Sequence, residues 1–169
     1  ASPAAQLVVF DGPATGSGEL FDEYLAFHFS QAGVDAKQRV IRLPQRSRAD
    51  FLAVLAACDL GLDTFGFSGG NTSLDAFSVG LPVVTLPGEF MRGRQTFAML
   101  ALMSSTIEAS LVARDADDYV RITTTLLGDS ETRETLQRAI RAESPRLFED
   151  VRAVAALRAA LLRAVRGTA

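Results

Sequence analysis

The sequence has little of the chemistry that disulfide and metal sites require. Its 169 residues include one cysteine, Cys58, and one histidine, His28. These two residues allow no disulfide framework and no zinc or histidine cluster. Cys58 falls in an apolar helical pattern, so we interpret it as a small buried hydrophobic residue. His28 is interpreted as a helix-face residue, because no spacing pairs it with Cys58 as a catalytic dyad.

Long apolar runs and a strong net charge are also missing. No apolar run approaches the length that crosses a bilayer, and the N-terminus lacks a basic segment followed by an apolar one. We therefore expect no membrane partner and a cytoplasmic location. Acidic residues outnumber basic ones by 20 to 17, with the basic residues spread along the chain, which argues against nucleic acid as a partner. An apolar fraction of 48% provides a real core and argues against disorder.

The first half of the sequence alternates short apolar strands with helices. The predicted strands span residues 6–10, 39–43, 59–62 and 82–86, and the predicted helices span 48–57 and 72–79, besides one that carries Leu20 to His28 and ends at Gly33. Ser47 followed three residues later by Asp50 is typical of a helix N-terminus. Continuous apolar strands joined by helices indicate a parallel sheet. The sequence therefore predicts an α/β fold, a Rossmann-like parallel sheet flanked by helices on both faces.

The second half is predicted to be mostly helical. Helices are expected near residues 93–103, 116–127, 130–142 and 150–166, with a short strand near 106–111. The last helix has valines and leucines on one face and arginines on the other, which indicates a helix packed against protein. No repeat or linker divides the chain, so residues 1–169 are predicted to form one lobe. The abrupt start on a strand suggests a piece of a longer protein.

The turn and helix start between Asp63 and Asp75 carry the strongest indication of a ligand site. They follow the carboxyl end of a strand, where open parallel sheets bind ligands. Gly69 and Gly70 allow the main chain to approach a bulky anion without a Cβ in the way. Three residues at the helix start then offer backbone N–H groups and side-chain donors, namely Asn71, Thr72 and Ser73. Each such bond to an anion contributes roughly 1.5–3 kcal/mol, so a diphosphate fits without a lysine.

Asp75 lies one turn into this helix, where a carboxylate is able to accept both hydroxyls of a ribose. The alternative interpretation is a simple capped helix, with Asn71 as its N-cap and the two glycines as an ordinary turn. From the pattern alone the two interpretations stand about level.

Other segments give weaker indications. Glu89 follows a strand end and either touches a sugar or faces water. Arg94 opens the next helix, where the dipole disfavours a cation unless an anion lies nearby, so we expect it to face a phosphate. Residues 12–18 have the wrong glycine spacing for a dinucleotide loop and are predicted to form an ordinary turn. Phe65 and Phe67 are secondary candidates that either pack beneath their loop or line the donor pocket.

Several segments together resemble the C-terminal catalytic lobe of the protein O-linked N-acetylglucosamine transferases, a lobe that the SPINDLY-type fucosyltransferases share. The segments are Cys58–Thr64, Gly69–Asp75, Gly80–Glu89 and Arg94. The resemblance runs from about Arg39 to Arg94 and continues more weakly through Ser144–Phe148 into the last helix. It implies a two-lobed GT-B glycosyltransferase whose C-terminal lobe ends in helices and binds a UDP-sugar or GDP-sugar. A preceding lobe, often with tetratricopeptide repeats before it, would hold a protein or small-molecule hydroxyl acceptor.

Carried over by position, the resemblance implies roles for individual residues. Asn71 and Thr72 match residues whose backbone meets the donor diphosphate, and Asp75 matches the ribose-binding carboxylate. Arg48 matches a basic residue near the nucleotide, and arginine keeps that charge while changing its geometry. Two family histidines are replaced, one by Gly70 on the diphosphate loop and one by Phe51, which is able to stack on a base.

The leading hypothesis is an inverting transfer of N-acetylglucosamine from a UDP-linked donor to a hydroxyl acceptor, with no metal and no further cofactor. No residue is assigned as the catalytic base, and the isolated chain is expected to be inactive. A second hypothesis is a degenerate lobe that binds a nucleotide or another protein without catalysis, because both histidines are replaced. A third is a different GT-B or sugar-nucleotide enzyme, such as an epimerase-like protein.

Overall fold

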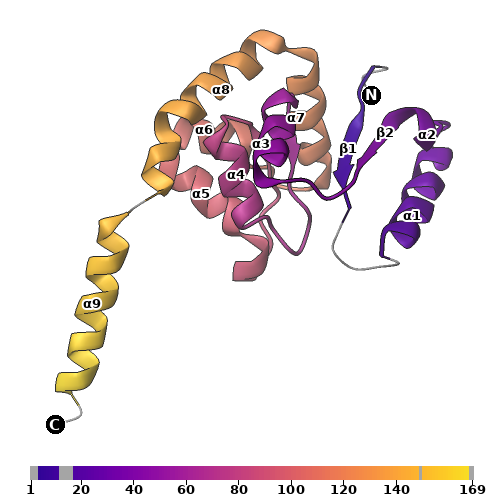
Figure 1. The fold of residues 1–169 in the computed structure, drawn as a ribbon. Coiled ribbons are helices and arrows are strands. Elements are labelled where there is room, and N and C mark those ends of the chain that lie inside the picture. Colours follow the sequence, from indigo (N-terminus) through magenta and orange to yellow (C-terminus); the bar gives the residue numbers. More distant parts are fainter. Residues whose placement is uncertain (1–3, 12–16, 149, 168–169) are drawn as a thin grey trace. The chain divides into compact units, whose positions relative to one another are not determined.

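The protein is described from a computed structural model, which covers residues 4–11, 17–148 and 150–167 (Figure 1). Its contacts divide the chain into two compact units, unit 1 from Ala1 to Ala57 and unit 2 from Cys58 to Ala169. The single lobe predicted from the sequence stays a prediction, and each unit is described by itself.

Unit 1 combines two parallel strands with three helices. Its elements are β1 (Leu7–Phe10), α1 (Ser17–Gln31), α2 (Ala36–Arg39), β2 (Val40–Leu43) and α3 (Arg48–Ala57). β1 and β2 pair in parallel, with Leu7 opposite Val40 and Phe10 opposite Leu43. Both predicted strands and their parallel pairing are therefore confirmed. The short helix α2 was not predicted; the Asp35 side chain caps it by accepting the N–H of Lys37 at 3.0 Å.

The helix ends in unit 1 follow the predicted signals. Gly33, two residues beyond the end of α1, has a φ of 69°, a left-handed conformation that suits glycine. Ser47 Oγ accepts the N–H of Asp50 at 3.2 Å and donates to its carboxylate at 2.8 Å, which confirms the predicted cap of α3. His28 is exposed on α1 with its ring centroid 4.3 Å from that of Tyr24, as expected of a helix-face residue. Of the predicted turn at 12–18, residues 12–16 lie outside the described residues.

Unit 2 has a small parallel sheet and most of the helices. Its elements are β3 (Gly61–Leu62), α4 (Asn71–Ser78), β4 (Val83–Val84), η1 (Met91–Gly93), α5 (Gln95–Met103), α6 (Ser105–Leu111), α7 (Ala116–Gly128), α8 (Ser130–Glu143), η2 (Ser144–Leu147) and α9 (Val151–Arg166). β3 pairs in parallel with β4, and Thr85 makes a further parallel bridge to Val112. Parallel strands alternating with helices confirm the predicted α/β class. Cys58 is half-buried at the start of this unit, and burial raises the pKa of its thiol.

The strand predicted near residues 106–111 is wrong, because these residues form α6. Ser104 caps this helix by accepting the N–H of Thr106 at 3.2 Å. Ile107 and Leu111, four residues apart, are both buried on one helix face. Only Val112, one residue beyond the helix, joins the sheet.

The core of unit 2 collects one apolar face from each of its main elements. Phe77 of α4, Val84 of β4, Leu100 of α5, Leu111 of α6 and Ile140 of α8 are all 0% exposed. α4 and α7 pack against β4, α5 packs against α6, and α7 packs against α8. This core fixes the start of α4 beside the carboxyl end of the sheet.

The last helix differs from its prediction. We expected α9 to be packed, yet no residue of α9 is buried, and Val151 and Leu157 are 75% and 62% exposed. An amphipathic pattern identifies the apolar face of a helix but not what covers it. Within the described residues, no helix combines the length and the apolar character needed to cross a membrane.

Candidate functional site

The start of α4 presents consecutive backbone donors. Gly70 is the N-cap residue without any side-chain cap, and its carbonyl accepts the N–H groups of Ser73 and Leu74, both at 3.1 Å. Among the described residues, no group accepts a hydrogen bond from the N–H groups of Gly70, Asn71 and Thr72. Asn71 is thus the first helical residue, and the alternative of an Asn71-capped helix is wrong. Consecutive free amides at the positive end of a helix favour an anion.

The two glycines before α4 differ in how much space a side chain would have. A Cβ on Gly69 would lie 2.3 Å from Ser73 Oγ and 2.9 Å from Thr72 Oγ1. A Cβ on Gly70 would lie 3.0 Å from the end of the Gln95 side chain, which is able to move. Gly69 is therefore the stricter requirement of the two.

The loop of residues 63–70, which joins β3 to α4, is held by the buried side chain of Asp63. This residue is 8% exposed. One carboxylate oxygen accepts the N–H of Gly69 at 2.7 Å. The other accepts the hydroxyls of Ser68 and Thr85, each at 2.7 Å. A carboxylate has room for these three bonds, so both the start of the loop and its end are tied to one group.

A second set of contacts ties this loop to α5. Thr96, in the first turn of α5, is 0% exposed and donates its N–H to Ser68 Oγ at 3.0 Å. Thr96 Oγ1 lies 2.9 Å from Ser68 Oγ and 2.8 Å from Ser73 Oγ. The sequence predicted that Ser73 offers free donors to a ligand, and this is wrong. Its N–H donates to the carbonyl of Gly70, and its hydroxyl faces Thr96 in the interior.

Tyr119 of α7 supports the 63–70 loop at its base. Its hydroxyl donates to the backbone carbonyl of Asp63 at 3.0 Å. Burial, and then the charge of Asp63, raises the pKa of Tyr119, so the phenol stays a donor. The ring of Phe65 meets the Tyr119 ring edge to face, with centroids 5.0 Å apart. Phe65 and Phe67 are nevertheless 56% and 69% exposed, so they do not pack beneath the loop.

A second turn, at residues 88–93, lies beside the 63–70 loop, because Ser68 donates its N–H to the carbonyl of Arg92 at 2.7 Å. Arg94 donates to the carbonyl of Gly88 at 2.7 Å, and its guanidinium lies 4.9 Å from the Phe97 ring centroid. Arg94 therefore stabilises this turn, and its contact with a phosphate stays a prediction. Glu89 is exposed on the same turn, and its contact with a sugar is likewise untested.

Asp75 lies inside α4 and is 9% exposed. The hydroxyl of Ser78 donates to its backbone carbonyl at 2.7 Å. Its predicted position one turn into the helix is confirmed. Its contact with a ribose stays a prediction.

Arg48 and Phe51, predicted beside the nucleotide, belong to unit 1 and are described apart from the other site residues. Arg48 is the exposed first residue of α3. Phe51 is half-buried and meets Phe10 edge to face, with centroids 4.8 Å apart. Its stacking on a base stays a prediction.

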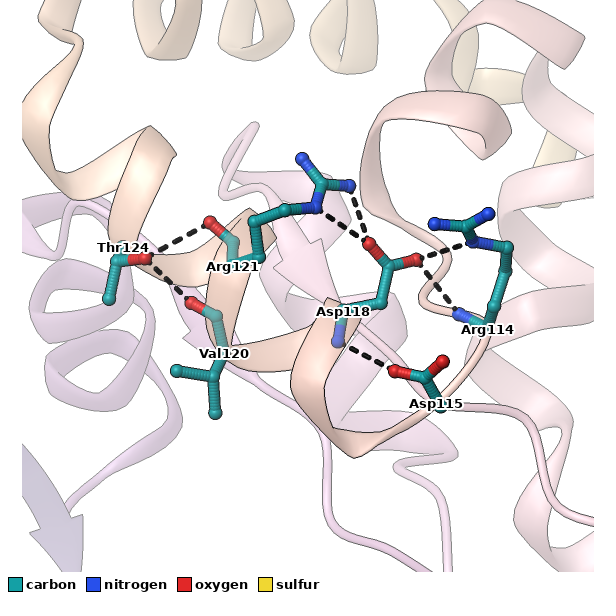
Figure 2. Close-up of polar contacts among 6 residues, drawn as sticks. All are labelled: Arg114, Asp115, Asp118, Val120, Arg121 and Thr124. Carbon is teal, nitrogen blue, oxygen red and sulfur yellow. Dashed lines mark hydrogen bonds and ion pairs between the residues drawn. The ribbon is translucent and has the colours of Figure 1, made fainter.

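A separate ionic cluster forms the start of α7 (Figure 2). Figure 2 shows the Asp118 carboxylate between the side chains of Arg114 and Arg121. It accepts the backbone N–H of Arg114 at 3.1 Å, its Nε at 3.0 Å, and the Arg121 guanidinium at 2.5 and 2.9 Å. These contacts, led by the Arg114 side chain, hold the pKa of the Asp118 carboxyl well below its usual range. The cluster stabilises the helix start, and Asp115 caps the helix by accepting the Asp118 N–H at 2.8 Å.

Sequence reasoning missed the polar residues that shape the site. These are Asp63, Ser68, Thr85, Thr96 and Tyr119. The one available signal was Asp63, an acidic residue directly after an apolar strand. The hydroxyl groups come from different segments, so only the folded chain brings them together. In the described part of the chain, no group of three or more His, Cys, Asp or Glu side chains is placed to hold a metal ion.

Comparison with known proteins places this geometry among glycosyltransferases. The model of glycosyl transferase family 41 matches residues 3–156. The probable UDP-N-acetylglucosamine–peptide N-acetylglucosaminyltransferase SPINDLY of Arabidopsis thaliana is 28% identical over 112 residues, covering 66% of this chain. That of Eustoma exaltatum subsp. russellianum is 26% identical over 110 residues, covering 60%. The matched part is 12% of the length of each relative.

A solved structure supports the same relationship. A mutant O-GlcNAc transferase of Thermobaculum terrenum superposes with a TM-score of 0.73 at 31% identity. The match covers 86% of this chain and 27% of that protein. The fold is therefore the α/β fold of a GT-B lobe, as the resemblance implied.

Proposed function

This chain belongs to glycosyl transferase family 41, and we propose that it is the donor-binding half of an enzyme that transfers N-acetylglucosamine from UDP-N-acetylglucosamine to a hydroxyl group. The acceptor is a protein or a small molecule, held by a preceding lobe in the cytoplasm, with tetratricopeptide repeats before that lobe. The names of the SPINDLY relatives, which specify this donor and a peptide acceptor, support the choice. The chain spans a small share of those relatives, so both substrates are part of the proposal.

The observation that carries the proposal is the row of free amides at Gly70, Asn71 and Thr72. A diphosphate is an anion with several acceptor oxygens, which suits donors that have no partner within the described residues. Thr72 is exposed and adds a hydroxyl. Gly69 keeps the approach open, because any side chain there would collide with Ser73.

The same amides support the chemical step. When the bond between sugar and diphosphate breaks, negative charge grows on the departing phosphate oxygen. Fixed N–H groups at the start of α4, together with the helix dipole, stabilise that charge without reorganisation. This half of the reaction needs no metal and no acid from the chain. The base that activates the acceptor hydroxyl is assigned to the preceding lobe, so the isolated chain is expected to be inactive.

The proposal is tested by calorimetry on the full-length gene product with UDP, GDP and uridine. We expect UDP to bind more tightly than GDP and uridine. Asp75→Asn removes a carboxylate oxygen that would accept a ribose hydroxyl, and it should weaken UDP binding by about tenfold. Asp117→Asn is the matched control, because Asp117 is an exposed acid in the first turn of α7. The proposal would be contradicted if the protein bound neither UDP nor GDP. It would also be contradicted if Asp75→Asn and Asp117→Asn lost the same amount of UDP affinity.

A second candidate is a degenerate lobe that binds a nucleotide without turnover. It is favoured by Gly70 and Phe51, which stand where family members have histidines. Both candidates predict UDP binding, but only the first predicts release of UDP from UDP-N-acetylglucosamine when acceptor protein is present. Tight UDP binding by a full-length gene product that never transfers sugar would select the second candidate.

A further inference from the structure

The buried hydroxyls behind the start of α4 form a chain of contacts that ends at a carboxylate. Ser73 Oγ lies 2.8 Å from Thr96 Oγ1, Thr96 Oγ1 lies 2.9 Å from Ser68 Oγ, and Ser68 Oγ lies 2.7 Å from a carboxylate oxygen of Asp63. Ser68, Ser73 and Thr96 are 1%, 4% and 0% exposed, so water does not compete for these contacts. The contacts therefore share only the protons that these side chains carry.

Ser68 joins the carboxylate to α5. Its hydroxyl lies 2.7 Å from a carboxylate oxygen of Asp63, which carries no proton and therefore accepts. The same hydroxyl lies 2.9 Å from Thr96 Oγ1, and its oxygen accepts the N–H of Thr96 at 3.0 Å. The hydroxyl of Thr96 also faces the carbonyl of Gly69, at 3.3 Å. The Asp63 carboxylate thus orients the Ser68 hydroxyl that contacts the first turn of α5.

We propose that Asp63 is the positioning residue of the diphosphate site, because its carboxylate orients the Ser68 hydroxyl of this chain and holds the 63–70 loop in its binding shape. The inference rests on the proposed function and deepens it. Asp63 also accepts the N–H of Gly69 at 2.7 Å, so the amides left for the donor begin at Gly70. The negative charge of Asp63 is compensated by three donors before any anion arrives.

Burial assigns different roles to neighbouring hydroxyls. Ser73 is 4% exposed and its hydroxyl faces Thr96 in the interior, at 2.8 Å. The hydroxyl of Thr72 belongs to an exposed residue. In the proposed site the diphosphate is therefore bound by the amides of residues 70–72 and by Thr72, while Ser73 belongs to the support behind them.

The test replaces Asp63 by an isosteric amide in the full-length gene product. In Asp63→Asn one acceptor oxygen becomes an NH2 donor, which faces either the N–H of Gly69 or the two hydroxyls and disrupts that contact. We expect the ratio of UDP affinity to uridine affinity to fall by about tenfold, since uridine has no diphosphate. Ser68→Ala breaks the chain but keeps the Gly69 contact, and it should lower the ratio by a smaller factor.

Asp118→Asn is the matched control, because Asp118 is another buried carboxylate of unit 2 that accepts several hydrogen bonds. It should leave the ratio unchanged. Folded Asp63→Asn and Ser68→Ala proteins with the wild-type ratio would overturn the inference. If Asp63→Asn does not fold, the ratio of UDP affinity to uridine affinity in Ser68→Ala decides alone: a lower ratio supports the inference, and the wild-type ratio overturns it. An equal fall in the control would also overturn it. A wild-type protein that binds UDP no better than uridine would overturn the proposed function, and the inference with it.

Discussion

The two units of the chain differ in how completely they bury their apolar faces. No described residue of unit 1 is buried, and Leu20 and Tyr24 of α1 are 69% and 63% exposed. Unit 2 has a core in which Phe77 and Leu100 are 0% exposed. Stability is therefore concentrated in unit 2, the unit that carries the start of α4.

Their polar contacts differ in the same way. In unit 1, Arg42 of β2 forms ion pairs with Asp11 and Asp22, and the hydrogen bond to Asp11 contributes most to raising the pKa of Arg42. All three side chains are partly exposed, so solvent screens these ion pairs. In unit 2 the Asp63 contacts are buried, where a broken hydrogen bond leaves an unpaired polar group. In this chain, the buried and fully bonded polar groups lie in the unit that has a closed core.

The largest expected effect is a cavity in the core of unit 2. Phe77→Ala should lower the free energy of unfolding by about 3–5 kcal/mol, the usual cost for a fully buried phenylalanine. Phe51→Ala in unit 1 should cost clearly less, because Phe51 is only half-buried. Urea unfolding of both variants measures the difference. Equal losses of unfolding free energy in the two variants would show that unit 1 packs Phe51 as tightly as unit 2 packs Phe77.

A smaller effect is expected from filling the space at Gly69. Gly69→Ala places a Cβ 2.3 Å from Ser73 Oγ, and overpacking of this kind costs about 1–3 kcal/mol. UDP affinity should fall with it, because the start of α4 must shift. Gly128→Ala is the control, since a Cβ there meets no atom within 4 Å. Calorimetry that finds the two variants alike would remove Gly69 from the site.

The Asp118 cluster predicts a dependence of stability on pH. The pKa of Asp118 is lower in the folded chain than in the unfolded one, so its contribution is present above the unfolded value, about 3.9, and is lost as pH falls below it. The stability difference between wild type and Asp118→Asn should therefore shrink below about pH 4. Thermal unfolding across that range measures it. A difference that stays constant would show that the carboxylate contributes nothing through its charge.

The smallest effect is expected in unit 1. Arg42→Met removes the ion pairs with Asp11 and Asp22 but keeps most of the side-chain volume. Because these groups are partly exposed, the melting temperature should change little, and the change should fade at high salt. A large loss that persists at high salt would mean that unit 1 depends on these charges more than on its apolar contacts.

Most elements were predictable because their signals are local. β1 is a continuous apolar run, and β2 is apolar apart from Arg42. Ser47 and Asp50 are only three residues apart, and Gly33 ends its helix by its own conformation. The strand expected at 106–111 was wrong because Ser104, one residue before the helix, caps it, and the apolar residues then fall on one helical face. A short apolar segment has a similar pattern in a strand and in a buried helix, so the pattern alone does not distinguish them.

The site was predictable only in part. Glycines and backbone donors at the start of α4 follow from the order of strand, turn and helix. The Asp63 contacts do not, because Thr85 and Thr96 meet Asp63 and Ser68 from 22 and 28 residues away in the chain. The exposed face of α9 was also not predictable, since a pattern of valines and leucines does not specify its neighbour.

The contact between Tyr119 and Asp63 has an optical consequence. The chain contains no tryptophan and two tyrosines, Tyr24 in unit 1 and Tyr119 in unit 2. In the Tyr24→Phe variant, the ultraviolet fluorescence of this chain would come from one ring, seated between Phe65 and the base of the 63–70 loop. The chain thus contains its own reporter beside the proposed diphosphate site, and no attached dye is needed to follow that loop.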